Sequence, residues 1–219
     1  MTFSELSSRE HRRLAELLDR ARGTQRTLEP LTRTYPELTL EDAGHVRDAL
    51  VDRRLAAGET LIGVVAATGS DGPFTWLTDE MLAANGLVSV TGLQRPQVTP
   101  RYALWVGEDS VLGCLELFDQ PFGEQLAPSD GVAANGGTVR IVLGGAVAAR
   151  PRFEVDGRPL PLANHRDHLR AVAPTLLSPR LPARALVVSA PLAAPVTLRA
   201  GSTARLTWTG GEAVWIEAT

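Results

Sequence analysis

The stretch RYALWVGEDSVLGCLELFD, residues 101–119, contains two apolar runs separated by a polar turn. Arg101–Val106 and Val111–Phe118 are rich in branched and aromatic residues, which are typical of strands. Gly107-Glu108-Asp109-Ser110 separates them and predicts a hairpin. This hairpin would let Arg101 on its first arm face Glu116 on its second.

Short strands continue on both sides of the hairpin. Asp156-Gly157 is a strong type I′ turn signal, and Pro159 and Pro161 indicate that the strand after it lies at a sheet edge. The further predicted strands are Thr60–Ala67, Gly86–Val90, Thr138–Leu143, Arg152–Val155, Arg158–Leu162, Ala185–Ser189, Val196–Arg199, Ala204–Thr209 and Ala213–Ile216.

Helices are predicted mainly before the strands. Ser7 and Glu10 form a capping-box pattern, and a second helix begins near Thr39, with Asp42 in the capping position, and stops at Gly58. The first helix is expected to bury Leu14, Leu17, Leu18 and Ala21, and the second Ala43, Val46 and Leu50. A later helix is predicted from about His165 to Leu177.

Helices followed by many short strands indicate the α+β class, with a rolled sheet or barrel. The 219 residues suit one domain, and no linker or repeat divides them. Within that domain we expect a helical segment, residues 1–58, packed on a β-rich core, residues 59–219.

Composition excludes several classes of function. The net charge is −3, and acidic residues match the N-terminal arginines, which predicts a solvated helical face and no binding of nucleic acid or membranes. Lysine is absent, which excludes Schiff-base and P-loop lysine chemistry. The one cysteine, Cys114, lies in an apolar run and is expected to be buried. With no signal peptide or 18-residue apolar run, a cytoplasmic location is expected.

Several stretches, in order along the chain, resemble the hydratase/decarboxylase branch of the fumarylacetoacetate hydrolase superfamily, whose members include 2-hydroxypenta-2,4-dienoate hydratases. The stretches that carry this resemblance are Leu40–Ala43 to Gly58-Glu59, Leu61–Gly63, Phe74–Met81, Arg95-Pro96, Leu115–Asp119, Val132–Asn135, Leu143–Gly145 and His165. The resemblance implies a fumarylacetoacetate hydrolase-like mixed β-roll or barrel with N-terminal helices. It also implies a homo-oligomer and a small-molecule substrate.

The resemblance further implies a Mg²⁺ or Mn²⁺ site built from three carboxylates, which suit hard cations. Thr99 and Arg101 stand at two of these positions, and of the three carboxylates Glu116 is retained. Val65 replaces a lysine of the family pattern, and Ala134 replaces an aspartate. These replacements predict that no metal and no other cofactor is bound, with a site more open and less polar than in the family.

Each candidate residue has two interpretations. Arg101 and Glu116 are either a substrate-orienting cation with a general acid or base, or a structural ion pair in place of the metal. His165 is either a proton-transfer group or a solvent-facing residue at a helix start. A third interpretation is that His165 and His168 together bind a metal ion. Asn135 is a pocket polar group or a turn residue before Gly136, and Trp76 lines the pocket or packs the core.

Three functions follow. The first is a metal-independent lyase, isomerase or cyclase that acts on an unsaturated keto or enol substrate. Such an enzyme would belong to small-molecule metabolism, including specialised biosynthesis. In it Glu116 and His165 are catalytic, and Arg101, Thr99, Asn135 and Trp76 bind substrate. The second is a non-catalytic scaffold or regulatory partner of a related hydratase/decarboxylase. The third is a Mg²⁺-dependent hydratase in which Glu108, Asp109 and Glu116 regroup as ligands.

Overall fold

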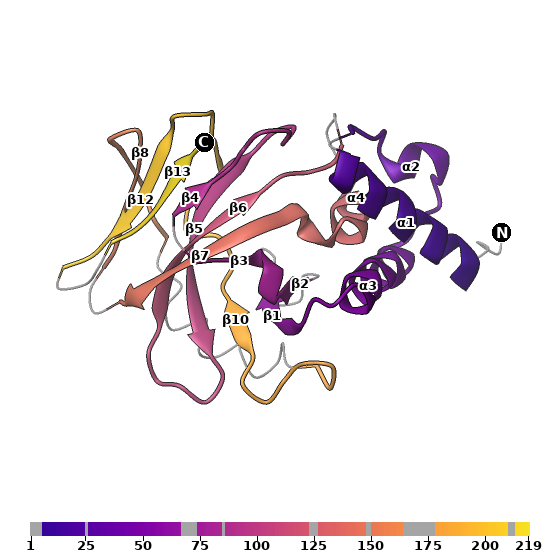
Figure 1. The fold of residues 1–219 in the computed structure, drawn as a ribbon, viewed down its shortest axis with the longest axis horizontal. Helices are drawn as coiled ribbons and strands as arrows, with labels where there is room; N and C mark the ends of the chain where they lie inside the picture. The colour runs from indigo at the N-terminus through magenta and orange to yellow at the C-terminus, as the bar shows by residue number, and fades with distance from the viewer. Residues whose placement is uncertain are drawn as a thin grey trace.

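The computed structural model describes residues 6–24, 26–66, 74–84, 86–122, 127–147, 150–163, 178–209 and 213–219. The helices gather at one end of the molecule and the strands form the remainder (Figure 1). The helices are α1 (Ser8–Thr24), α2 (Leu31–Thr34), α3 (Leu40–Ala56) and α4 (Pro128–Ala133). The predicted helix from about His165 to Leu177 lies outside the described residues.

Two sheets are present among the described residues, both mixed. The larger has the order β2-β1-β10-β5-β6-β7-β3, with β11 also paired to β5, and the smaller has the order β4-β13-β12-β8-β9. The strands are β1 (Leu61–Val65), β2 (Thr75–Thr78), β3 (Leu82–Ala83), β4 (Leu87–Val88), β5 (Gln97–Trp105), β6 (Leu112–Phe118), β7 (Thr138–Ala146), β8 (Arg152–Val155), β9 (Arg158–Leu160), β10 (Leu186–Val188), β11 (Val196–Thr197), β12 (Thr203–Thr207) and β13 (Val214–Ala218).

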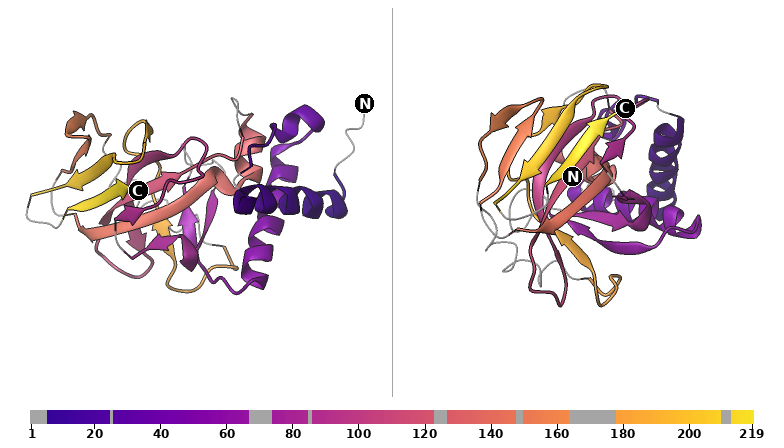
Figure 2. Two further views of the ribbon diagram at one scale, coloured as in Figure 1. Left: turned by 45° about the horizontal axis from the view of Figure 1, so that its top comes forward. Right: turned by 60° about the vertical axis from the view of Figure 1, so that its left-hand side comes forward.

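The larger sheet curls, and the smaller sheet packs on one of its faces (Figure 2). Glycine allows the two sheets to approach closely. A Cβ on Gly113 of β6 would lie 2.7 Å from Cζ3 of Trp208, and a Cβ on Gly144 of β7 would lie 2.9 Å from Cβ of Val214. The core between the sheets contains Leu115, Leu117, Phe153, Leu206 and Ile216. This architecture confirms the predicted α+β class and rolled sheet.

Sequence signals account for the two long helices. Ser7 Oγ accepts a hydrogen bond from Glu10 N and Ser7 N donates to Glu10 Oε2, which confirms the first capping box. Thr39 and Asp42 form the same reciprocal pair at the start of α3. Gly58, with a φ of 105°, follows the end of α3, as predicted.

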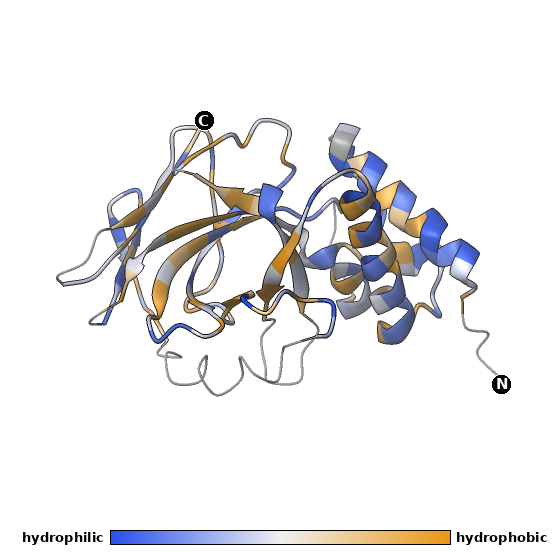
Figure 3. Cartoon of the chain, turned by 60° about the horizontal axis from the view of Figure 1, so that its bottom comes forward, coloured by the Kyte–Doolittle hydropathy of each residue, from blue (hydrophilic) through white to orange (hydrophobic). Residues whose placement is uncertain are grey.

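The long helices carry both hydrophobic and hydrophilic residues (Figure 3). Leu14, Leu18 and Ala21 of α1 are buried as predicted, and so are Ala43, Val46 and Leu50 of α3. Leu17 is 43% exposed, which corrects the prediction of its burial. The prediction that the N-terminal arginines form a solvated face is also wrong in part, because Arg47 and Arg54 of α3 are buried.

The hairpin at 101–119 is present, with β5 and β6 antiparallel. Strand β5 begins four residues earlier than predicted and includes Pro100. The turn at Asp156-Gly157 has φ values of 49° and 73°, and β9 lies at the sheet edge, both as predicted. No helix in the described part of the chain is long and apolar enough to cross a membrane.

Candidate functional site

An ion pair between Arg101 and Glu116 lies on the face of the larger sheet that is turned away from the smaller one. In the β5–β6 ladder Arg101 is opposite Cys114 and Thr99 is opposite Glu116, so the two charged residues are diagonal neighbours on one face. Arg101 Nε donates to Glu116 Oε2 at 2.5 Å. The predicted contact across the hairpin is confirmed.

Protein groups satisfy most of the remaining hydrogen-bonding capacity of the pair. Arg101 Nη1 donates to the carbonyl oxygens of Ala66 at 3.0 Å and Ser189 at 2.5 Å. Thr138 Oγ1 donates to Glu116 Oε1 at 2.6 Å. Arg101 is 8% exposed and Glu116 2%, so both residues of the pair are buried. The expectation of a site more open than in the family stays a prediction.

One group of Arg101 has no partner among the residues that the structure describes. Its Nη2 donates no hydrogen bond to any residue in the described ranges, and it is not among their fully buried unpaired atoms. A guanidinium nitrogen in this state can still accept a ligand oxygen as its hydrogen-bond partner.

Thr99 lies on the same face of β5 but its hydroxyl is used elsewhere. It is fully buried, and its Oγ1 donates to the carbonyl oxygen of Ala193 at 3.0 Å. The hydroxyl therefore ties β5 to the segment after β10. Val65, at the position of the family lysine, is buried in the apolar cluster on this face with Leu186 and Ile141.

Asn135 holds the backbone of β2. Its Oδ1 accepts from Trp76 N at 2.8 Å, and its Nδ2 donates to Trp76 O at 3.0 Å. The side chain is buried and its backbone has a φ of 54°, which asparagine tolerates better than most residues. The structure thus places Asn135 in contact with Trp76, both of them candidates, and the side chain of Asn135 is not hydrogen-bonded to Arg101 or Glu116.

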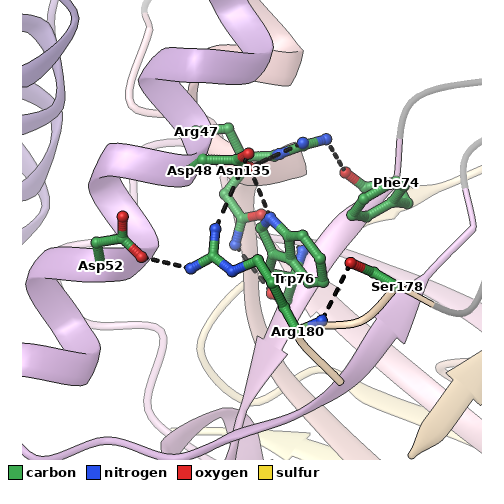
Figure 4. Close-up of polar contacts among 8 residues, drawn as sticks. All are labelled: Arg47, Asp48, Asp52, Phe74, Trp76, Asn135, Ser178 and Arg180. Carbon is green, nitrogen blue, oxygen red and sulfur yellow. Dashed lines mark hydrogen bonds and ion pairs between the residues drawn. The ribbon is translucent and has the colours of Figure 1, made fainter. Parts of the chain in front are cut away.

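The indole of Trp76 lies within a cluster of charged side chains from α3 and residue 180 (Figure 4). Its Nε1 donates to Asp48 Oδ1 at 2.7 Å, and the guanidinium of Arg180 lies 5.2 Å from the ring centroid. Arg47 lies 5.6 Å from the same centroid, and Arg180 also pairs with Asp52. Trp76 is 2% exposed, so it fixes α3 against β2.

Two other candidates can be placed. Cys114 is fully buried, and burial raises the pKa of its thiol, which removes it as a nucleophile. His165 and His168 lie outside the described residues, so the proton-transfer role of His165 stays a prediction.

The residues that are present do not fit the metal site that the resemblance implies. Glu116 is in contact with a guanidinium, a fixed positive charge that disfavours a divalent cation. Glu108, offered as an alternative ligand, pairs instead with Arg184. The described residues contain no group of three or more His, Cys, Asp or Glu side chains arranged to hold a metal ion.

A second polar region, which sequence reasoning missed, lies between α1, α3 and β7. It is a cavity of about 220 Å³ whose lining includes Arg22, Arg54 and Arg140. The three residues are up to 118 positions apart, so no local pattern links them. A usable signal was the position of Arg54 four residues after Leu50, on the apolar face of its helix.

Comparison with known proteins identifies the fold. No family model and no curated protein sequence matches the chain significantly. The 4-oxalocrotonate decarboxylase of Pseudomonas putida G7, solved with magnesium and adipate, is similar at a TM-score of 0.85 and 19% identity, over 98% of this chain and 99% of that one. The same enzyme with calcium and acetate gives a TM-score of 0.83.

A 2-hydroxyhepta-2,4-diene-1,7-dioate isomerase from Mycobacterium marinum is similar over 74% of this chain and 76% of that one, at a TM-score of 0.53 and 13% identity. The decarboxylase matches nearly end to end, helices included, whereas the isomerase matches a smaller part. This chain therefore has the fold of the 4-oxalocrotonate decarboxylase, a fumarylacetoacetate hydrolase-like fold.

Proposed function

We propose that this chain is a metal-independent enzyme that acts on a small unsaturated keto or enol acid, as a lyase, isomerase or cyclase. The observation that carries the proposal is the guanidinium of Arg101. It lies against Glu116, the retained carboxylate, where the resemblance implies a metal ion, and its Nη2 is unpaired among the described residues. Proteins of this fold include a 4-oxalocrotonate decarboxylase and a 2-hydroxyhepta-2,4-diene-1,7-dioate isomerase.

The proposed chemistry uses Arg101 as a fixed cation. Contacts with Glu116, Ala66 and Ser189 hold the guanidinium in place, so little reorganisation is needed when negative charge develops on a substrate oxygen. Its Nη2 would donate to the keto or enolate oxygen of the substrate. Glu116 would move a proton to or from the neighbouring carbon, after its contact with Arg101 loosens.

The test is turnover of a 2-hydroxy-2,4-dienoate or 2-keto-enoate by the purified protein. Turnover is measured as the loss of ultraviolet absorbance of the conjugated substrate. We expect the rate to be the same in a chelator and in millimolar Mg²⁺, and to fall by about 10²-fold or more in Glu116→Gln. Glu108→Gln, which removes a carboxylate in the turn of the same hairpin, is the matched control and should retain the rate. Activity that requires Mg²⁺, or a fully active Glu116→Gln, would refute the proposal.

A second function is favoured by a different observation. Both oxygens of Glu116 and two nitrogens of Arg101 are bonded to protein, and both residues are buried, as in a purely structural pair. The chain would then be a scaffold or regulatory partner of a related, metal-binding hydratase/decarboxylase. Co-purification with such a homologue, together with no turnover on the same substrates, would support this alternative over the first.

A further inference from the structure

The cavity between the helices and the start of β7 is lined by an unusual set of charges. β7 begins beside α1 and α3 in the ribbon (Figure 1), and all three elements contribute to the lining. Arg22 comes from α1, Arg54 from α3 and Arg140 from β7. Neither Arg101 nor Glu116 is among the lining residues, so this cavity is separate from their ion pair.

Arg54 is the central observation, because its guanidinium has no partner among the described residues. The residue is 7% exposed, and its side chain forms no hydrogen bond and no ion pair with any residue that the structure describes, although none of its nitrogens is fully enclosed. Burial is the main reason that the pKa of Arg54 is lowered, and the charges of Glu59 and Asp19 act against this from farther away. A buried guanidinium normally has a hydrogen-bonded anion beside it, since desolvation of an unpaired charge is costly.

The other two arginines increase the need for a counter-ion. Arg22 is exposed by its total surface, but its guanidinium is surrounded by protein and donates to Thr138 O at 3.0 Å. Burial, followed by the positive charges of Arg54 and Arg140, lowers the pKa of Arg22 to about 9, so it stays protonated at neutral pH. Arg140 donates to its neighbouring carbonyl, that of Val139. The positive charges of the three arginines therefore repel one another.

The nearby acidic residues are already engaged. Asp119, which also lines the cavity, accepts hydrogen bonds from the backbone N–H groups of Gln94 and Arg95. Asp19 accepts from Arg53, and Glu59 accepts from Thr78. Asp19 and Glu59 line, with Glu80, an adjoining and more open depression to which Arg22, Arg54 and Arg140 also contribute. They reduce the positive charge but supply no hydrogen-bond partner to Arg54.

Part of the remaining wall of the cavity is apolar. Leu18, Leu50, Leu93 and Val139 line it beside the arginines, and Arg26, Gln94 and Asp119 complete its polar lining. The volume of about 220 Å³ is below the range of roughly 300–1,000 Å³ that is usual for drug-sized ligands. A small ligand with an anionic head and a short hydrocarbon body would satisfy both the guanidinium groups and the apolar wall.

We infer that this cavity is a binding site for a small organic carboxylate, with Arg54 as its main anchor and Arg22 and Arg140 as supporting cations. Arg54 forms the paired contact with the carboxylate that it lacks in the protein alone. The aliphatic part of the ligand packs against Leu18, Leu50 and Val139. The inference stands apart from the proposed activity, because it uses neither Arg101 nor Glu116.

The test is a calorimetric titration of the full chain with hexanoate, its neutral analogue hexanamide, and inorganic phosphate. We expect binding of hexanoate, weakened in higher salt, and at least tenfold weaker binding of hexanamide and phosphate. Arg54→Met should weaken hexanoate binding at least tenfold. Arg53→Met, the adjacent and more exposed residue on the same helix, is the matched control and should leave it unchanged.

A second readout guards against a variant that fails to fold. Hexanoate should raise the melting temperature of the unmodified protein and of Arg53→Met, but not that of Arg54→Met or of Arg140→Met. Equal binding of hexanamide would show a purely apolar cavity, and equal binding of phosphate a site for any anion. Either result, or undiminished binding by both Arg54→Met and Arg140→Met, would overturn the inference.

Discussion

The guanidinium of Arg101 and the carboxylate of Glu116 neutralise each other in a part of the sheet that is largely closed to water. Two charges in such a place depend on each other, because the loss of one leaves the other desolvated and unpaired. We therefore expect Arg101→Met to lower the free energy of unfolding by about 3–5 kcal/mol. Urea denaturation would measure the loss.

The double variant Arg101→Met/Glu116→Gln tests the coupling between the two residues. It should cost clearly less than the sum of the two single variants, because no unpaired charge is left. Additive losses would show that the two residues stabilise the fold independently.

Asn135 provides a second test at this scale. Asn135→Gly keeps a residue that is comfortable at a φ of 54° but removes both hydrogen bonds to the backbone of Trp76, and should cost about 1–3 kcal/mol. Asn135→Ala loses the same bonds and adds backbone strain of about 1–2 kcal/mol. Thermal unfolding followed by circular dichroism would compare the two variants; an Asn135→Gly protein as stable as the unmodified chain would contradict the assigned role.

Sequence reasoning succeeded where partners are close in the chain. Arg101 and Glu116 are 15 residues apart on one hairpin, and that hairpin, together with their positions in the family pattern, was enough to predict the contact. Asn135 and Trp76 are 59 residues apart, and their contact depends on how the short helical turn Asn135–Gly137 packs against β2, which no local pattern encodes. The charged cluster around Trp76 was missed for the same reason, since Arg180 and the α3 residues come together only in the folded molecule.

Among the elements, α3 has the most complete start signal. Asp42 accepts hydrogen bonds from Thr39 and His11, and these outweigh the effect of burial, so that the pKa of Asp42 lies below its usual value. A carboxyl group with a depressed pKa stabilises the fold above its unfolded-state pKa of about 3.9. That contribution disappears as the pH falls through the lower, folded-state value.

We therefore expect Asp42→Asn to be less stable than the unmodified protein at pH 6, and the difference to shrink below about pH 4. Urea midpoints measured from pH 6 to pH 2.5 would show this. A difference that is constant over the whole range would mean that ionisation of Asp42 contributes nothing. Thr39→Ala, which removes the cap, should cost about 1 kcal/mol.

Strands β2, β3 and the start of β5 escaped prediction for physical reasons. All four residues of β2 are buried, so it lacks the alternation that marks a half-buried strand, and β3 has two residues. Pro100 is an unfavourable residue within a strand, because proline has no N–H to donate. In the structure Pro100 lies between the positions paired with β10 and those paired with β11, so no ladder bond is lost there.

For the molecule as a whole, the helices and the sheets share a packed boundary. Phe122, just after β6, is 1% exposed and lies in the same apolar cluster as Leu14, Leu18 and Val46. The backbone beside it bonds to the segment after α1, with Leu28 N donating to Pro121 O at 2.7 Å. The division into a helical segment, residues 1–58, and a β-rich core, residues 59–219, stays a proposal, and these contacts favour a single cooperative unit.

Phe122→Ala tests that cooperativity. We expect a loss of about 3–5 kcal/mol, with helix ellipticity and tryptophan fluorescence still changing at one common midpoint. Leu17→Ala, a truncation at an exposed position on α1, should change stability by less than about 0.5 kcal/mol. Two separate midpoints in Phe122→Ala would show that the helices unfold independently of the sheets.

The enclosed thiol of Cys114 has a practical consequence. It is the sole cysteine of the chain, it has no exposed surface, and the strands on both sides of β6 must separate before a reagent can reach it. The rate at which a thiol-specific dye labels the native protein therefore measures how often the sheet opens. This labelling rate needs no denaturant and no engineered probe. Its change with each ligand or variant discussed above would show how that ligand or variant alters the opening of the sheet around Cys114.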